Sequence, residues 1–448
     1  MTLILLGLWL LSSAALGIAT GRWFGSWFNP VWLMGFRWSG LLLLYSLGLV
    51  QFDAVRTSTW VVAIGSVGAF AIGASVPGWV FRGGTVDHRD ATASHLRSVV
   101  SEIRLRRAVL VLFAIGSILL ARYLWTVWHS FGLRTLFETP YVVRQALAEG
   151  AIPAGFHYFY VMELVAAIGF VHVFLFRLRK NVVIAVVMTI AAASVVLTTG
   201  KVNIAKVLVW WFFLLMFLRI DRPFRASVAM AIPVAMVGFA LFATLTVWGG
   251  EAFVDTPWST HVATDWSGSN LTYFYVLSTG PFVALDKLLQ DETVIFEWGK
   301  YTLLPVVKLL HEAGLPIDVP THIGRFYDIP IPFNVATYLD VLYTDFGLAG
   351  TLVIPVCLGV ISGLAYFRLR RTRSLWWVLA NSILALWIYA SVAAASYIKP
   401  SYWFQIMVAL LVARYAEGRA ALRSRVQNEY PPAPLLTQSS FNTVSRSL

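Results

Sequence analysis

One long stretch of this chain, residues 249–345, concentrates side chains that acid–base and anion-binding chemistry require. A histidine titrates near neutral pH, a carboxylate can act as a general base, and a guanidinium binds phosphate in a bidentate fork. The residues of the stretch that we select for such roles are His261, Asp265, His322, Arg325 and Asp345. Asp345 also stands at the head of an apolar run, where a carboxylate can cap a helix instead.

The same stretch lacks the residue patterns of a metal site. It contains no His-Glu-x-x-His, no Asp-x-Asp and no cysteine, and the single cysteine of the chain, Cys357, lies in an apolar run. One cysteine can form neither an internal disulfide nor a cysteine-based metal cluster. The sequence therefore predicts chemistry that uses no metal and no cofactor.

Four cations elsewhere in the chain are candidates for binding an anion. Arg144 lies in a segment, 129–155, that has no topological reason to be basic, and Lys201 follows a glycine at the end of an apolar run. Lys206 lies one turn into the next run, and Arg122 lies toward the end of an earlier one. A cation at such a depth is costly unless it serves a partner or an anionic ligand, although long side chains can also extend to the membrane surface.

The elements that must position these residues are membrane-spanning helices. Apolar residues make up 58% of the 448 residues, charged residues only 12%, and the mean hydropathy is +0.73. A soluble protein of this size could not bury so much apolar surface. Apolar runs of roughly 20 residues, the length that crosses a hydrocarbon core about 30 Å thick, recur along the chain. We expect an all-α polytopic integral membrane protein.

We place about eleven transmembrane helices along the chain. They lie near residues 2–20, 31–50, 58–77, 108–128, 156–176, 182–199, 204–220, 226–248, 346–367, 375–396 and 402–415. With this assignment every basic cluster falls on one side of the membrane, as expected for loops retained in the cytoplasm. The net charge of +12 is therefore a topology signal and does not indicate nucleic-acid binding. The amino terminus is expected outside and the carboxyl terminus inside.

This topology divides the chain into four regions. Residues 1–248 hold helices 1–8 with a periplasmic loop at 129–155 and a cytoplasmic loop at 78–107. Residues 249–345 form one large periplasmic loop containing short helices, and 346–427 hold helices 9–11. The Pro- and Ser-rich residues 428–448 are expected to be a disordered cytoplasmic tail.

Three motifs at the expected outer face resemble one family. Residues 332–350 read Pro-Phe-Asn-Val-Ala-Thr-Tyr-Leu-Asp-Val-Leu-Tyr-Thr-Asp-Phe-Gly-Leu-Ala-Gly, with Asn334 and Tyr343 before the Asp-Phe-Gly. Residues 275–286 contain Tyr, Gly, Ala and Asp at matching positions, and Thr199-Gly200-Lys201 forms a small-residue turn followed by a base. In these features the chain resembles the Wzy-type O-antigen and oligosaccharide repeat-unit polymerases. It departs from them at Leu285, where an aromatic residue is common, and at Lys201, where arginine is usual.

The resemblance implies a GT-C-like polymerase/ligase architecture in the bacterial cytoplasmic (inner) membrane. The implied donor and acceptor are undecaprenyl-pyrophosphate-linked oligosaccharides, delivered to the periplasmic leaflet by a flippase, and a separate chain-length regulator is an expected partner. Pyrophosphate binding falls to Arg144, Lys201, Lys206 and Arg122, glycan binding to Asn334, Tyr343, His261 and Asp265, and catalysis to His322, Arg325 and Asp345. His322 is the leading general base.

Other functions remain open at this stage. An O-antigen ligase has a similar architecture and donor but transfers finished glycan to a lipid A core. Other polyprenyl-dependent glycosyltransferases usually place an acidic motif after the first span, and residues 21–30 contain no acid. A transporter or flippase would need a polar path through the spans, whereas the polar residues gather on one side.

Overall fold

The structure is a computed structural model of the chain. It describes residues 2–81, 92–139, 142–143, 158–176, 181–198, 201–220, 270–320, 327–329, 332–333 and 337–429. The eighth expected span, 226–248, and the tail from 430 onward lie outside the described residues.

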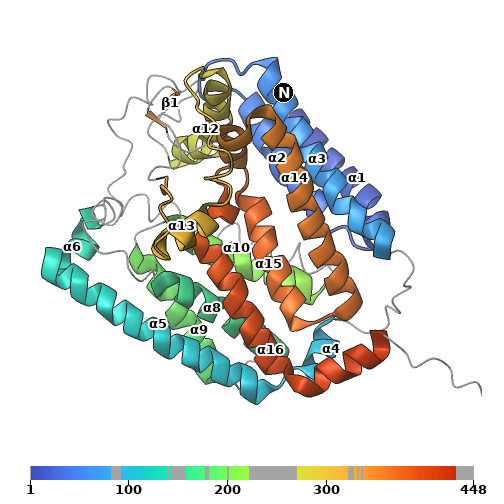
Figure 1. The fold of residues 1–448 in the computed structure, drawn as a ribbon, viewed down its shortest axis with the longest axis vertical. Helices are drawn as coiled ribbons and strands as arrows, with labels where there is room; N and C mark the ends of the chain where they lie inside the picture. The colour runs from blue at the N-terminus through green and yellow to red at the C-terminus, as the bar shows by residue number, and fades with distance from the viewer. Residues whose placement is uncertain are drawn as a thin grey trace, which may run out of the picture.

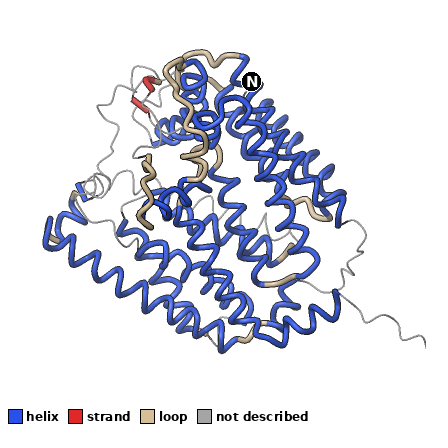
Figure 2. Tube along the Cα trace, in the orientation of Figure 1, coloured by secondary structure: helices blue, strands red, loops and turns tan. Residues whose placement is uncertain are grey.

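The regular secondary structure of the described chain is helical apart from one short strand pair, and loops join these elements (Figures 1 and 2). The helices are α1 (Thr2–Phe24), α2 (Pro30–Ser46), α3 (Thr57–Phe81), α4 (Thr92–Val99), α5 (Glu102–Phe131), α6 (Leu133–Glu138), α8 (Tyr158–Phe176), α9 (Val182–Ser194), α10 (Lys201–Leu218), α12 (Asn270–Gln290), α13 (Leu304–Glu312), α14 (Tyr338–Thr372), α15 (Leu375–Ala390) and α16 (Pro400–Glu429). Two 3-10 turns follow α9 and α15, at Val195–Thr198 and Ser396–Ile398. Strands β1 (Tyr327–Asp328) and β2 (Pro332–Phe333) pair antiparallel.

Long apolar helices mark the protein as membrane-embedded. Among the described residues, four helices are long and apolar enough to cross a membrane: α3, α5, α8 and α14. Shorter apolar helices at Val182–Ser194, Ala205–Leu218 and Leu375–Ala390 pack with them. The expected all-helical class is therefore confirmed for the described residues, and the four helices are compatible with the expected membrane protein. The count of eleven spans stays a prediction.

One end of the bundle, which we call the basic end, gathers helix termini that carry arginines. Arg97 of α4 donates through Nε to the carbonyl oxygen of Leu175, near the end of α8 (2.7 Å). The backbone N–H of Ser101, before α5, donates to the carbonyl of Ala416 in α16 (3.0 Å). Arg370 lies against the α1–α2 connection at Gly25. Basic ends that are distant in sequence thus lie together in space, as the topology requires.

The opposite end, which we call the capped end, is covered by α12, α13 and the α2–α3 connection (Figure 1). Asp286 of α12 accepts hydrogen bonds from the backbone N–H of Arg56 (2.9 Å) and from the hydroxyl of Thr59 at the start of α3 (2.6 Å). The Tyr275 hydroxyl donates to the carbonyl of Leu44 (2.8 Å). The motif at 275–286 therefore fixes α12 onto the ends of α2 and α3.

Helices α3 and α14 meet at backbone contact because glycines line their interface. A Cβ atom at Gly73 would overlap the backbone carbonyl oxygen of Val356. Cβ atoms at Gly359 and Gly363 would overlap the carbonyl oxygens of Phe70 and Ala74 in the same way. Small residues of this kind let membrane helices approach at backbone contact.

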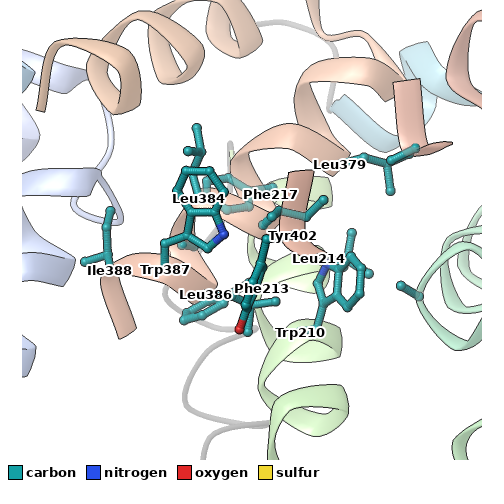
Figure 3. Packing of buried hydrophobic residues seen from close by; sticks show 14 of the residues in the cluster. Trp210, Phe213, Leu214, Phe217, Leu379, Leu384, Leu386, Trp387, Ile388 and Tyr402 are labelled. Carbon is teal, nitrogen blue, oxygen red and sulfur yellow. The ribbon is translucent and has the colours of Figure 1, made fainter. Parts of the chain in front are cut away.

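Large aromatic side chains fill the core between α10, α15 and α16 (Figure 3). Trp210 is fully buried and donates through Nε1 to the hydroxyl of Ser382 (2.8 Å). The ring of Trp387 meets that of Tyr402 edge-on, with centroids 6.1 Å apart. A buried tryptophan needs such a partner for its N–H, so Ser382 also sets the register between α10 and α15.

Several helix boundaries differ from the sequence expectations, and α16 runs to Glu429, well past the expected 415. Helix α14 begins at Tyr338, well before the expected 346, and is interrupted at Gly347, where φ is 62°. Helix α15 ends at Ala390, short of the expected 396. Helix α12 has 21 residues, so the region expected to hold short helices also holds a long one. Thr337 caps α14 by accepting from the N–H of Leu339, which is why the helix starts early.

Candidate functional site

An ion pair lies in the interior between α8 and α10. The ammonium of Lys206 is 2.5 Å from Oε2 of Glu163, and the side chains are 9% and 0% exposed. Gln405 of α16 joins them: its Nε2 donates to the same Glu163 oxygen (2.7 Å), and its Oε1 accepts from Lys206 (3.4 Å). Buried charges in a membrane protein are costly unless paired, so this cluster is a candidate functional site.

The three side chains lie at one depth. Helices α8, α10 and α16 begin at Tyr158, Lys201 and Pro400, and each polar residue comes five positions after the start of its helix. At 1.5 Å per residue the cluster is about 7.5 Å below these starts. Because α8 and α16 reach the basic end with their later residues, their starts lie at the capped end. The cluster therefore lies just beneath the capped end.

Aromatic rings surround the ammonium group. Lys206 Nζ lies 4.3 Å from the ring centroid of Tyr402 and 5.6 Å from that of Tyr160. An aromatic face attracts a cation, and the attraction strengthens when the cation is desolvated. Tyr402 also contacts Trp387, so the polar cluster rests directly on the aromatic core of Figure 3.

Lys399 adds a second cation to this neighbourhood. It is exposed immediately before α16, and among the described residues no carboxylate pairs with it. Although Lys399 reaches the surface, desolvation by the protein atoms around its ammonium group and, next, the positive charge of Lys206 lower the pKa of Lys399. Two lysines and one glutamate leave one excess positive charge beside the N-terminal ends of α10 and α16, which carry partial positive charge themselves. The arrangement is suited to attracting an anion.

The free oxygen of Glu163 offers a further chemical possibility. Its Oε1 is buried and has no hydrogen-bond partner among the described residues. The buried carboxylate therefore retains capacity to accept one more hydrogen bond. Within the described residues no group of three His, Cys, Asp or Glu side chains could hold a metal ion.

Asp345 takes part in a different arrangement, at the break in α14. It is fully buried, and its carboxylate oxygens accept from the backbone N–H groups of Tyr301 (3.2 Å) and Thr302 (2.5 Å). Its own carbonyl accepts from the N–H of Trp298 (3.2 Å). The carboxylate thus fastens the 297–302 turn to α14, a positioning role.

Only some of the remaining candidate residues lie within the described part of the chain. Tyr343 is half-buried, with its ring edge-on to that of Phe296 at 6.2 Å. Arg122 is exposed on α5, and Lys201 begins α10, although its side chain lies outside the described part. The candidates that lie outside the described residues are Arg144, His261, Asp265, His322, Arg325 and Asn334. Of the anion-binding candidates, the described residues therefore define the interactions of Lys206 best.

Three members of the cluster were missed in the sequence. Glu163 is the only acid in the apolar run 156–176, and that isolation is a signal that could have found it. Gln405 and Lys399 gave no comparable signal, because an amide near a span end and a lysine before a proline are both ordinary.

Comparison with protein-family models, with curated proteins and with solved structures gives no match to this chain.

Proposed function

We propose that the protein is a glycosyltransferase that polymerises lipid-linked oligosaccharide repeat units at the capped end, taken as the periplasmic face of a bacterial inner membrane. The observation that carries the proposal is the buried Glu163–Lys206 pair beside the exposed Lys399. Cations at the depth of lipid headgroups suit a substrate whose diphosphate joins a lipid tail to a glycan. The motifs around Asn334, Tyr343 and Lys201 give the resemblance on which the substrate class rests.

In the proposed reaction, a hydroxyl oxygen of the acceptor repeat attacks the anomeric carbon of the growing chain. The bond between that carbon and the diphosphate oxygen breaks, and undecaprenyl pyrophosphate leaves with both bonding electrons. The proton of the attacking hydroxyl passes to a general base, for which His322 remains the leading candidate. Direct displacement inverts the anomeric configuration.

Stabilising the leaving diphosphate is the main task of the protein in this scheme. Pyrophosphate is a good leaving group, so fixed positive charge matters more than an acid catalyst. Lys399 joins Arg144, Lys201 and Arg325 as a proposed cation, with Arg122 as a second choice. Glu163 largely neutralises the charge of Lys206, so we place Lys206 beneath the proposed diphosphate site. There it contacts the ring of Tyr402 and adds to the positive electrostatic potential of the site.

The decisive experiment supplies the purified protein in lipid nanodiscs with one synthetic lipid-linked repeat unit. A polymerase gives a ladder of products that differ by one repeat, and each linkage has the inverted configuration. An O-antigen ligase leaves the repeat unpolymerised and transfers it only when a lipid A core acceptor is added. Absence of both products with a substrate that a known polymerase accepts contradicts the proposal, and retained configuration contradicts the displacement step.

A further inference from the structure

Apolar side chains are exposed at the capped end, outside the spanning helices. They belong to the turn before α13 and to α13 itself, and we call them the lipid-contact surface: Ile295, Trp298, Leu303, Val306 and Leu309. Trp298 is 80% exposed and Leu309 66% exposed. Val306 and Leu309 are three residues apart and so lie on neighbouring positions of one helix face. An exposed apolar patch of this kind marks a contact with another apolar phase.

The turn that displays Trp298 is held in place. Trp298 has a φ of 49°, a region that bulky side chains rarely adopt. Its N–H donates to Asp345 (3.2 Å), and the N–H of Glu297 donates to the carbonyl of Thr344 (3.1 Å). Such backbone strain persists only where the surrounding structure enforces it. The exposed indole is thus presented by a fixed turn.

The lipid-contact surface continues onto α14. The ring of Phe296 lies against Gly347, and the ring of Phe346 lies against Gly299. Beyond Gly347, α14 continues as an apolar spanning helix with Leu348, Leu352 and Val353 exposed. In a membrane-embedded protein this exposed face of α14 meets lipid chains. The turn and α13 therefore adjoin the lipid-facing surface where a helix leaves the membrane, the depth at which tryptophan is enriched.

We propose that the lipid-contact surface inserts into the lipid leaflet at the capped end, as an interfacial anchor that Asp345 joins rigidly to α14. The anchor recognises the apolar boundary of the leaflet and not its charge. Residues 295–312 carry two lysines and two glutamates, with Lys300 paired to Glu297 at 3.0 Å, so this segment has no excess charge to attract anionic headgroups. Apolar burial is then the driving force. This inference does not depend on the proposed glycosyltransferase activity.

Spin labelling in nanodiscs tests the anchor. Cys357 is first replaced by serine, and single cysteines are then introduced by Trp298→Cys, Val306→Cys and Leu309→Cys, with Asp318→Cys as an exposed polar position in the loop after α13. Each is labelled with a nitroxide, and its collisions with oxygen and with a water-soluble nickel chelate are measured. The ratio of oxygen to nickel collisions at 298, 306 and 309 should exceed that at 318 severalfold, equally in zwitterionic and anionic lipid.

Two results would overturn the inference. A ratio at 306 and 309 equal to that at 318 means that water covers the surface. Low collision rates with both reagents mean that protein, either another chain or a masking segment, covers it. Because 306 and 309 lie on α13 and take no part in the hydrogen bonds to Asp345, they give a reading even if Trp298→Cys disturbs the turn. A higher ratio in anionic than in zwitterionic lipid also contradicts the charge-independent anchor.

Discussion

The carboxylate of Glu163 and the ammonium of Lys206 lie 2.5 Å apart, buried between α8 and α10, and Gln405 of α16 bonds to both. Each charge is stable at this depth because the other neutralises it. The ammonium of Lys206 also contacts the ring of Tyr402, and Tyr402 in turn contacts Trp387 of the aromatic core. The polar cluster and the packing of three helices thus depend on one another.

Removing one partner of this pair should destabilise the protein. Glu163→Gln leaves the ammonium of Lys206 buried without a counter-charge, at a cost of about 3–5 kcal/mol in the free energy of unfolding. The double variant Glu163→Gln/Lys206→Met removes both charges and should recover much of the loss. Thermal unfolding of the purified variants in detergent measures both effects. If the double variant melts as low as the sum of the single ones predicts, the residues are not coupled.

Glycine contact between α3 and α14 predicts a position-specific effect. Gly73→Ala places a methyl group against the backbone of Val356 and should cost about 1–3 kcal/mol through overpacking. Gly68→Ala lies on the same helix with no neighbour within 4 Å of the new Cβ, so it should be neutral or stabilise by about 0.5–1 kcal/mol. Melting temperatures of the two variants give the comparison. Equal destabilisation by both would show that the pair is not in backbone contact.

Asp345→Asn should loosen the 297–302 turn. The variant keeps one acceptor oxygen but replaces the other with an NH₂ group that faces a backbone donor, a loss of about 1–3 kcal/mol. Hydrogen exchange of peptides covering Tyr301 and Thr302 should become faster. Asp318→Asn, at an exposed position in the same region, serves as the control and should leave the exchange unchanged. Unchanged exchange in Asp345→Asn would remove the positioning role.

Thiol labelling in intact spheroplasts shows which side of the membrane the capped end faces. In a Cys357→Ser background, a cysteine introduced at Asp318 should react with a membrane-impermeant reagent, because α13 and its following loop belong to the capped end. A cysteine at Arg371, exposed near the end of α14, should react only after the cells are opened. The reverse labelling pattern would place the polar region in the cytoplasm and would end the proposed function.

Charge removal tests the cations of the proposed mechanism. Arg144→Ala, Lys201→Ala and Lys399→Ala should each abolish the product ladder while the amount of protein in the membrane stays normal, because the leaving diphosphate loses its stabilising charge. Lys308→Ala on α13 is the control and should leave the ladder intact. Long chains retained in all three variants would exclude these residues as the diphosphate site, without bearing on the anchor.

The amino-acid composition was enough to predict a helical membrane protein, and the apolar runs predicted the bounds of most described helices to within a few residues. Helix α3, for example, covers Thr57–Phe81 where the apolar run indicated 58–77. The early start of α14 was not predictable from hydropathy, because a local cap sets it: the Thr337 hydroxyl accepts from the backbone N–H of Leu339. The partner of Lys206 could not be predicted either, since an ion pair across 43 residues depends on how two helices pack.

The common depth of Glu163, Lys206 and Gln405 has a consequence for how the chain assembles. Gln405 follows Lys206 by 199 residues, so synthesis brings the two charged residues into the membrane long before the amide that completes their bonding. Until then only two helices hold the pair. Helix α16 therefore completes the hydrogen bonding of this cluster, and a chain truncated before α16 should remain a substrate for membrane quality-control proteases.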